Sequence, residues 1–401
     1  MSGVQAVRSA VAVVVAFAVV GACSDSSGGG GAASPPAART ATSAPAAGDP
    51  LATSPAPPGD PTAAAMVTYL NGRAAKKRFT GAVLVVRRGQ VLVRFAAGQA
   101  DTAARVPVRP ETIFRLASVS KQFTAMLVLK QRDRGRLKLD DPVCRYVVPK
   151  YVKACPKAWR PITIREILDH TSGIPDISEM PDFFPKLPKP TTTQEIINRF
   201  AGKKLDFKPG TNWKYSNSGY ILAGAIVEKV AKKPFGTVLH DDITAPLGLG
   251  HTGYSTGNPP PGYAKGYVRL GAPAPPLNGS QANAAGGVFS NVDDMGRWDR
   301  AFGANKVAPP ATVKEAFTAQ ARCPSGGCLD SPSTGYAFGW LVDKLRGHRY
   351  LYHPGLLQGY HTSNAYLPDD DIAVVVLSNV QNTDVNGINR HLATMALTGR
   401  S

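Results

Sequence analysis

Two residues near the middle of the chain, Ser118 and Lys121, have the types and the spacing of an activated nucleophile. They stand three positions apart at the head of the apolar run 122–131, so on a helix the hydroxyl and the amine share one face. A serine hydroxyl is a weak nucleophile, but a lysine that an apolar environment keeps neutral can accept its proton. Ser-x-x-Lys arises by chance about once in a chain of this length, and Lys121 could instead be a solvated lysine. The interpretation therefore depends on partners elsewhere in the chain.

Polar residues in two later stretches could complete such a site. Tyr215 and Asn217 stand directly ahead of a predicted helix over 218–233. His353, followed by Pro-Gly, stands at the end of a predicted strand. Each has a plainer interpretation, since Tyr215 and Asn217 could form a turn and a helix cap, and His353 could be an ordinary strand end.

Taken in this order, the three motifs resemble those of the penicillin-binding proteins and serine β-lactamases. The resemblance is to the class C-like branch, which includes D-alanyl-D-alanine carboxypeptidases and related esterases. It runs from Ala63 to the C-terminus and includes the phrases IFRLASVSK, ILDHTSGIP, PGTNWKYSNSGY and GGVFSNVDDM. Three short motifs in one order are far more specific than any one of them.

The resemblance implies a role for each of these residues. Ser118 would attack a carbonyl carbon and form an acyl-enzyme, while Lys121 and Tyr215 would share the general-base work. A cationic lysine nearby would favour the phenolate form of Tyr215. Asn217 would hydrogen-bond either the substrate's amide or Lys121, and His353 and Gly355 would lie at the substrate. The backbone N–H groups of Ser118 and Leu356 would form an oxyanion hole.

The same resemblance implies a β-lactamase/transpeptidase-like fold of the α/β (α+β) class, with an antiparallel sheet, flanking helices and an inserted, mainly helical region. The sheet-containing part would comprise 63–115 and 335–401, and the helical part 116–334. Hydrophobic patterns predict a helix over 63–77, a hairpin over 79–97, strands over 336–342, 350–353, 360–367 and 372–377, and a last helix over 385–397.

The third motif departs from the family pattern. Pro354 stands where a threonine hydroxyl would help to hold a substrate carboxylate, and proline offers neither a hydroxyl nor an N–H. His353 takes the place of a lysine, and with a reference pKa of about 6.5 it is a weaker source of positive charge. The sequence therefore leaves recognition of a carboxylate open.

Three functions are compatible with these residues. The first is a D-alanyl-D-alanine carboxypeptidase-like or β-lactamase-like amide hydrolase that acts through Ser118 on a small-molecule or peptidoglycan-derived substrate. The second is an esterase with the same machinery, which Pro354 favours. The third is a catalytically inactive lipoprotein that binds wall polymer. We expect a monomer that needs no cofactor and no metal.

The first 62 residues have the composition of an export and tethering segment. Arg8 and the apolar run 10–22 predict a signal peptide over 1–22, too short to span a bilayer. The run ends in Val-Gly-Ala-Cys, which resembles a bacterial lipoprotein box with Cys23 as the lipidated residue; ordinary signal cleavage is the alternative. Residues 23–62 are mostly Ser, Gly, Ala and Pro and predict a disordered linker. The protein would then cross the cytoplasmic membrane and be anchored to its outer face.

Charge and cysteine usage agree with export. The chain has 46 Lys and Arg against 28 Asp and Glu, a net charge of +18 that suits an anionic surface. The cations are scattered and no nucleic-acid-binding motif accompanies them, so we expect no nucleic-acid partner. Close spacing favours disulfides between Cys144 and Cys155 and between Cys323 and Cys328 over the other pairings, and it does not fit a zinc site.

One further motif matches a catalytic pattern but is not expected to be catalytic. The stretch around Ser255 fits Gly-x-Ser-x-Gly, whose chemistry in α/β-hydrolases needs a strand before the serine and a helix after it. Prolines on both sides exclude these elements, so Ser255 is predicted to lie in a loop without a catalytic role. His170 and His361 are interpreted as structural, because no metal-ligand spacing surrounds them.

Overall fold

The computed structural model describes residues 49–257, 260–329 and 331–399. The predicted signal peptide over 1–22, the lipidation site at Cys23 and most of the predicted linker lie outside these residues. The prediction that the linker extends to residue 62 is wrong at its C-terminal end. A strand forms at Ser54–Pro55, and Asp60 caps a helix that begins at Pro61 by accepting hydrogen bonds from two backbone N–H groups.

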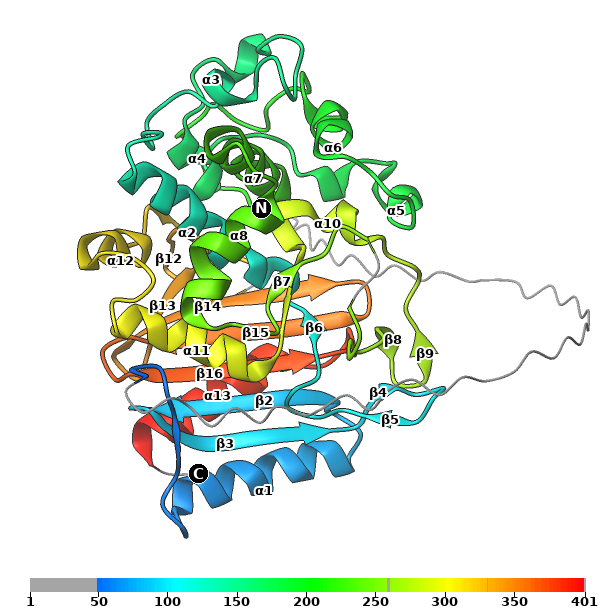
Figure 1. Cartoon of the computed structure of the whole chain (residues 1–401), viewed down its shortest axis with the longest axis vertical. Coiled ribbons are helices and arrows are strands. Elements are labelled where there is room, and N and C mark those ends of the chain that lie inside the picture. Colours follow the sequence, from blue (N-terminus) through cyan, green and yellow to red (C-terminus); the bar gives the residue numbers. More distant parts are fainter. Residues whose placement is uncertain (1–48, 258–259, 330, 400–401) are drawn as a thin grey trace, which may run out of the picture. The chain divides into compact units, whose positions relative to one another are not determined.

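The core element is a nine-stranded sheet with the order β1-β3-β2-β16-β15-β14-β13-β12-β11 (Figure 1). All neighbours are antiparallel except β1 and β3, which are parallel. As predicted, the N-terminal hairpin joins the last strands, through the pair β2 and β16. The strands are β1 (Ser54–Pro55), β2 (Gly81–Arg87), β3 (Gln90–Ala97), β11 (Ala321–Arg322), β12 (Gly335–Tyr336), β13 (Leu341–Leu345), β14 (His348–Leu357), β15 (Tyr360–Leu367) and β16 (Ile372–Ser378).

Helices cover both faces of this sheet, so its central strands are almost continuously apolar. On one face α1 (Pro61–Ala75) and α13 (Val385–Thr398) pack against one set of strand side chains. On the other, α2 (Ser120–Asp133) and α11 (Val292–Gly303) pack against the alternate set. The face that carries α2 also carries the candidate site.

The predicted strand over 336–342 is interrupted. Gly339 adopts a positive φ of 82° in the turn between β12 and β13. A Cβ there would lie 2.7 Å from the backbone oxygen of Lys121, so the turn packs directly against the head of α2. The sequence pattern missed this break because the reason for it lies more than 200 residues away along the chain.

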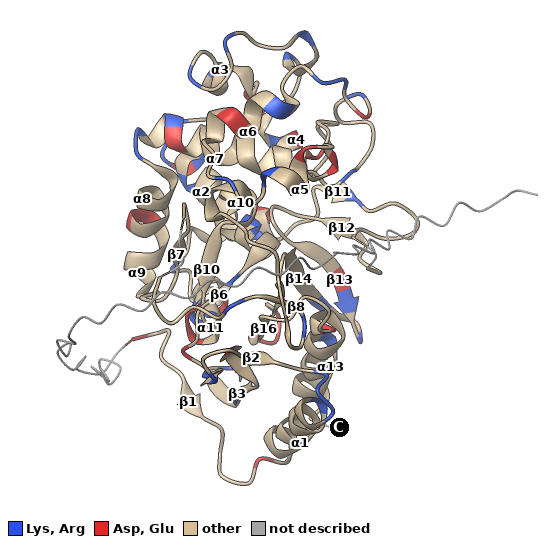
Figure 2. Ribbon diagram, turned by 90° about the vertical axis from the view of Figure 1, so that its right-hand side faces the viewer, with Lys and Arg blue, Asp and Glu red and all other residues tan. Residues whose placement is uncertain are grey.

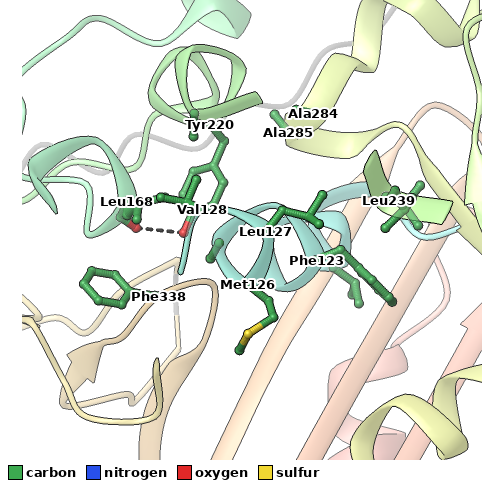
Figure 3. Packing of buried hydrophobic residues seen from close by; sticks show 14 of the residues in the cluster. Phe123, Met126, Leu127, Val128, Leu168, Tyr220, Leu239, Ala284, Ala285 and Phe338 are labelled. Atoms are coloured by element: carbon green, nitrogen blue, oxygen red, sulfur yellow. Dashed lines mark hydrogen bonds between the residues drawn. The ribbon is translucent and has the colours of Figure 1, made fainter. Parts of the chain in front are cut away.

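The inserted region is mainly helical and surrounds α2, which is apolar on nearly all sides and therefore buried (Figure 3). Phe123, Met126, Leu127 and Val128 of α2 lie among side chains from several of the surrounding elements. The helices of this region are α3 (Cys144–Val147), α4 (Ile164–Leu168), α5 (Phe183–Lys186), α6 (Thr193–Phe200), α7 (Asn217–Ala231), α8 (Phe235–Leu239), α9 (Ala245–Leu247), α10 (Gly279–Gly286) and α12 (Pro310–Ala316), with short helices η1 (Ala117–Val119), η2 (Lys157–Trp159), η3 (Ile177–Glu179) and η4 (His240–Thr244).

Smaller sheets complete the fold. They are β6 (Phe114–Arg115) with β10 (Val288–Ser290) and β7 (Gly253–Tyr254), β4 (Gln99–Asp101) with β5 (Val106–Pro107), and β8 (Tyr267–Arg269) with β9 (Ala272–Pro273). Lys and Arg are spread over several elements rather than along one helix (Figure 2).

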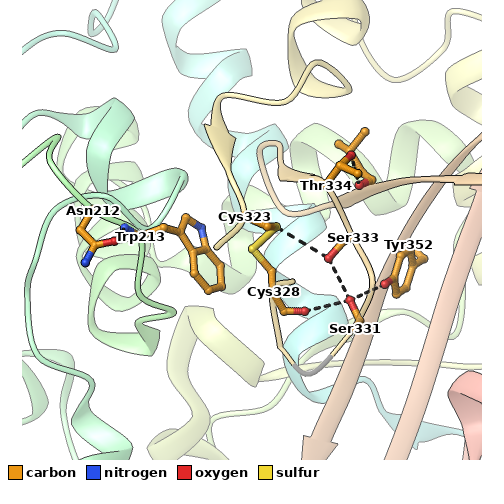
Figure 4. The surroundings of a disulfide bond; sticks show 9 residues. Asn212, Trp213, Cys323, Cys328, Ser331, Ser333, Thr334 and Tyr352 are labelled. Atoms are coloured by element: carbon orange, nitrogen blue, oxygen red, sulfur yellow. Dashed lines mark hydrogen bonds between the residues drawn. A yellow bond between two sulfur atoms is a disulfide. The ribbon is translucent and has the colours of Figure 1, made fainter. Parts of the chain in front are cut away.

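Both predicted disulfides are present. Cys144 pairs with Cys155, and Cys323 pairs with Cys328, with Cα atoms 5.5 and 5.2 Å apart. The second bridge closes a short loop near Trp213 and Tyr352 (Figure 4). In the described part of the chain, no helix is both long and apolar enough to cross a bilayer. Nor do any three His, Cys, Asp or Glu side chains gather there as a metal site would require.

Candidate active site

The fold brings the three predicted motifs together at the head of α2. Ser118 lies in η1, and Lys121 is the second residue of α2. Tyr215 precedes α7, whose first residue is Asn217. Ala117, just before the serine, has a φ of 49°, which is strained for a residue with a Cβ and marks a sharp turn at the serine. The serine is therefore displayed on a tight bend held by the packing around it.

Lys121 is fully buried, and its ammonium nitrogen has three partners. Nζ lies 3.2 Å from Ser118 Oγ, 2.8 Å from Asn217 Oδ1 and 3.0 Å from the backbone oxygen of Ala285. Burial lowers the pKa of Lys121 from 10.5 to about 7, and the negative charge of Asp176 partly opposes this shift. A large share of Lys121 is therefore neutral at pH 7.

The partners of Lys121 also orient its lone pair. A neutral amine has two N–H donors and one lone pair, and the oxygens of Asn217 and Ala285 can only accept hydrogen bonds. When both N–H groups point at these oxygens, the lone pair remains for the third partner, the hydroxyl of Ser118. The arrangement thus suits removal of the serine proton by Lys121.

Asp176, which belongs to none of the three predicted motifs, fixes the orientation of Asn217. Its carboxylate oxygens lie 3.2 and 3.0 Å from Asn217 Nδ2, and Oδ1 also accepts the backbone N–H of Asn217 at 3.2 Å. Because a carboxylate only accepts, the amide nitrogen must face Asp176 and the amide oxygen must face Lys121. The signal available in the sequence was the acid that directly follows the phrase ILDHTSGIP.

Tyr215 hydrogen-bonds to Ser118 through its side chain. Burial raises the pKa of Tyr215 well above 10; the hydrogen bond to Ser118 opposes the shift and the charge of Asp176 adds to it. The prediction that a cationic lysine favours the phenolate is therefore wrong, because the cost of burying a charge outweighs the effect of a lysine that is itself partly neutral. At neutral pH Tyr215 is therefore a protonated phenol, and Lys121 is the group of the two whose pKa suits a general base.

His353 is fully buried, and both of its ring nitrogens have partners within the protein. Its Nδ1 lies 2.6 Å from the backbone oxygen of Pro354, to which it donates, and its Nε2 accepts from the hydroxyl of Tyr336 at 3.0 Å. Burial lowers the pKa of His353 to about 3, so the ring is neutral at pH 7. The structure does not bring His353 to the cavity wall, where a substrate contact would require it.

Gly355 lets β14 approach the serine. A Cβ at Gly355 would lie 2.3 Å from the backbone oxygen of Leu116 and 2.3 Å from Thr362 Oγ1, so no other residue fits. Thr362 Oγ1 also donates to the Leu116 oxygen at 2.8 Å. Gly355 acts here as a spacer behind the wall, and the next residue, Leu356, reaches the same cavity as Ser118.

A cavity of about 600 Å³ opens over the serine. Among the described residues its side chains are apolar or uncharged polar, with apolar ones in the majority. They belong to Ala117, Ser118, Ile177, Ser178, Phe183, Phe184, Leu187, Tyr215, Asn217, Ile221, Gln281, Ala282, Ala285, Leu329, Pro354, Leu356, Leu357, Gln358, His361, Gln381 and Asn386, and Gly286 adds backbone.

The two histidines interpreted as structural have different surroundings. His170 is buried, and its Nδ1 accepts the backbone N–H of Ser216 at 3.1 Å while its ring packs 4.5 Å from the ring of Tyr215. It thus supports the loop that carries Tyr215. His361, by contrast, lines the cavity. As predicted, Ser255 lies in a loop, where its hydroxyl donates to the backbone oxygen of Gly257 at 3.2 Å. The prediction that prolines exclude a strand before Ser255 is wrong, because β7 ends at Tyr254.

Comparison with known sequences identifies one family. The sequence profile described as Beta-lactamase matches residues 33–397. Penicillin-binding protein 4* of Bacillus subtilis (strain 168) is 29% identical over 327 residues, which cover 76% of this chain and 69% of that protein. The protein flp of Staphylococcus aureus (strain N315) is 27% identical, and the matched region covers 78% of this chain and 62% of flp. This chain thus spans less than two thirds of the length of flp.

Solved structures share the fold. The octameric penicillin-binding protein homologue from Pyrococcus abyssi has a TM-score of 0.73 at 24% identity, covering 84% of this chain and 78% of that one. The D-stereospecific amidohydrolase from Streptomyces sp. has a TM-score of 0.67 at 26% identity, covering 86% of this chain and all of the other. The predicted β-lactamase/transpeptidase-like fold is confirmed.

Proposed function

We propose that this chain, which belongs to the beta-lactamase family and is a serine hydrolase of that fold, cleaves uncharged esters and amides. The observation that carries the proposal is the arrangement of Ser118, Lys121 and Tyr215 on the floor of a cavity with uncharged walls. The catalytic groups supply nucleophilic acyl transfer, and the walls select a substrate that carries no charge near the reacting carbonyl.

In the proposed reaction, neutral Lys121 takes the proton of Ser118 as Oγ attacks the carbonyl carbon. Backbone N–H groups of Ser118 and Leu356 stabilise the oxyanion of the tetrahedral intermediate. The proton then passes through the hydroxyl of Tyr215 to the leaving alcohol or amine, and an acyl-enzyme remains. A water molecule then gives a proton to the same groups and attacks the acyl carbon; the bond between that carbon and Ser118 Oγ breaks, Oγ takes the proton back, and the acid leaves.

The strand side of the site argues against a carboxylate-bearing substrate. His353 is neutral and buried, and Pro354, which does line the cavity, offers no hydroxyl and no N–H. A substrate carboxylate placed against the strand side would lose hydration without gaining a cation there, which is costly. We therefore place uncharged substrates ahead of β-lactams and D-alanyl peptides with a free C-terminus.

A second candidate function is hydrolysis of D-amino acid amides. It is favoured by the likeness to the D-stereospecific amidohydrolase, which covers all of that chain at 26% identity. Comparing D- and L-phenylalanine amides as substrates tests this. A clear preference for the D-form supports the second candidate, and equal turnover or none contradicts it.

The first test of the proposal compares three reagents on wild-type protein and Ser118→Ala. We expect a fluorophosphonate to label wild type only, p-nitrophenyl butyrate to be turned over by wild type only, and a fluorescent penicillin to label weakly. Labelling by penicillin at low concentration would instead support the carboxypeptidase-like or β-lactamase-like alternative. Absence of both labelling and turnover would support the catalytically inactive, wall-polymer-binding lipoprotein.

Export, anchoring and oligomeric state are further parts of the proposal. We infer secretion across the cytoplasmic membrane and lipidation of Cys23 from the sequence pattern over 1–23. Replacing Cys23 with Ala should move the protein from the membrane fraction to the medium or periplasm. An unchanged distribution would exclude the lipid anchor. A monomer is expected in sedimentation.

A further inference from the structure

The two most exposed large apolar side chains of the described residues both stand at the catalytic cavity. Phe184 is 62% exposed and Leu356 is 56% exposed, and each contributes to the cavity lining. The remaining exposed apolar side chains of comparable size belong to elements outside the cavity, such as Val106 on β5. Exposed apolar surface that collects at a cavity mouth marks a place where an apolar ligand can gain affinity.

Phe184 is held in its exposed position by neighbouring contacts. Its helix, α5, is preceded by Asp182, which forms ion pairs with Arg199 at 2.8 Å and with Lys186 at 2.7 Å. The end of α5 is fixed to α10, because Gln281 Nε2 donates to the backbone oxygen of Lys186 at 3.0 Å. These contacts fix the backbone that carries Phe184 beside the cavity.

Apolar surface continues inward from this mouth. The Phe183 ring lies edge-on to the Phe184 ring, with centroids 5.4 Å apart. Leu187 and Ile221 line the same cavity deeper in the helical region. Leu356 adds apolar surface from β14, whose backbone lies beside the serine. An alkyl or aryl group attached to the reacting carbonyl would thus contact apolar side chains from both parts of the fold.

We propose that Phe184 and Leu356 form an apolar mouth that selects substrates with a hydrophobic group of several carbons beside the scissile bond. This inference rests on the proposed function, because it names the substrate class of the same site. Transfer of a methylene group from water to an apolar site should raise kcat/KM by about fourfold. The preference should thus grow with chain length until the cavity is filled.

The test uses two series of esters on the full chain. One series lengthens the acyl group of p-nitrophenyl esters from acetate to octanoate, and the other lengthens the alcohol of acetate esters. For wild type we expect kcat/KM to rise by about three- to fourfold per CH₂ in at least one series. The series that rises identifies whether the mouth holds the acyl group or the leaving group.

Variants then locate the effect. Phe184→Ser should lower kcat/KM for the longest ester of the rising series about tenfold more than kcat/KM for the acetate, since the short ester makes less contact with the mouth. Phe184→Leu should retain the slope. The matched control is Val106→Ala, which removes exposed apolar surface on β5 outside the cavity and should behave like wild type.

Two outcomes would overturn the inference. One is a flat wild-type response in both series while the acetate ester is turned over and the fluorophosphonate labels Ser118; the proposed function then stands and the apolar mouth does not. The other is an equal loss of short and long esters in Phe184→Ser, which would indicate a general structural defect. Absence of fluorophosphonate labelling in wild type would remove the proposed function and this inference with it.

Discussion

The cavity has a helix side, at α2 and α7, and a strand side, at β14, and the two sides contribute different kinds of groups. On the helix side, the buried nitrogen of Lys121 has three oxygen partners within 3.2 Å, and Asp176 orients the amide of Asn217 behind it. On the strand side, His353 is neutral and buried, Gly355 is a spacer, and Leu356 presents an exposed apolar side chain. The side chains proposed for acyl transfer lie on the helix side, whereas the strand side contributes a backbone N–H and part of the apolar surface of the cavity.

This difference predicts which positions of the site tolerate a substitution. Removing a partner from the helix side leaves a buried polar or charged group without a hydrogen bond, which costs about 1–3 kcal/mol or more. On the strand side the proposed oxyanion hole uses a backbone N–H, which any non-proline residue supplies. Except at Gly355, where a Cβ does not fit, we expect side chains of this strand to be exchangeable without loss of the acyl-transfer step. The following predictions test this division.

The largest effect is expected from removing the base. Lys121→Met should reduce kcat/KM for an uncharged ester by about 10⁴-fold or more. Residues that activate a nucleophile act as a unit, so removing one of them removes nearly all of the rate that the unit supplies. Methionine fills a similar volume without an amine, so folding should persist. Ester turnover and fluorophosphonate labelling measure the loss.

The matched control for this variant is Lys130→Met on the same helix. Lys130 donates to the backbone oxygen of Val307 at 2.6 Å and lies far from the serine along α2. It should keep activity within about threefold, as expected for a change outside the reacting groups. Equal loss in both variants would mean that Lys121 acts through the stability of α2 and not as a base.

The pH dependence of activity should report the pKa of Lys121. Because burial lowers this pKa to about 7, kcat/KM should rise with pH through about 7 as the amine becomes neutral. Tyr215 and His353 should add no step near neutral pH, since the pKa of Tyr215 is raised well above 10 and that of His353 is lowered to about 3. A profile of ester turnover from pH 5 to 9 measures this, and a flat profile would contradict it.

The same shift has a consequence for stability. The pKa of Lys121 is lower in the folded state than its value of 10.5 in the unfolded chain, so the unfolded chain binds more protons between about pH 7 and 10.5. Stability contributed by this residue should therefore increase with pH across that window. Urea unfolding at pH 7 and pH 9 should show a rise that Lys121→Met abolishes.

Much of this site could be predicted from the sequence because its chemistry lies in short motifs. Ser118, Lys121, Tyr215 and Asn217 were found by type and spacing, and the fold brings all four together. The strands were found by their apolar runs, since a sheet covered on both faces needs apolar residues on both.

What sequence reasoning missed depends on contacts between distant segments. The backbone oxygen of Ala285, 164 residues from Lys121, carries no pattern that links it to the lysine, and Asp176 is marked only by its place directly after ILDHTSGIP. The sequence predicts the phenolate of Tyr215, whereas the structure favours the phenol, because burial raises the pKa of Tyr215 more than a nearby amine lowers it. The extent of burial cannot be read from the sequence. His353 was assigned to the substrate by its position in a motif, whereas its side chain turns inward to Tyr336.

An intermediate effect is expected from the residue that orients Asn217. Asp176→Asn should reduce kcat/KM by about 10- to 100-fold, because it replaces charge-assisted hydrogen bonds by neutral ones and lets the Asn217 amide turn. Loss of the negative charge also removes an influence that raises the pKa of Lys121, so the acidic limb of the pH profile should move to lower pH.

A control distinguishes this positioning role from a general structural one. Asp369→Asn removes an exposed ion pair with Arg349 at 2.8 Å on the sheet and should leave both the rate and the pH profile unchanged. If Asp176→Asn lowered activity without moving the acidic limb, Asp176 would act only through folding and not through the lysine.

The smallest effect is expected on the strand side, at His353. Glutamine can accept from the Tyr336 hydroxyl and donate to the Pro354 oxygen, as the neutral imidazole does. His353→Gln should thus keep kcat/KM for uncharged esters within about threefold and leave the profile between pH 5 and 9 unchanged, with a stability loss of about 1–2 kcal/mol from repacking. Unfolding by urea and ester turnover measure the two quantities. Loss of a titration step near pH 6–7 in this variant would show instead that a protonated His353 takes part in substrate binding. The strand side would then supply a charged side chain as well as backbone and apolar groups.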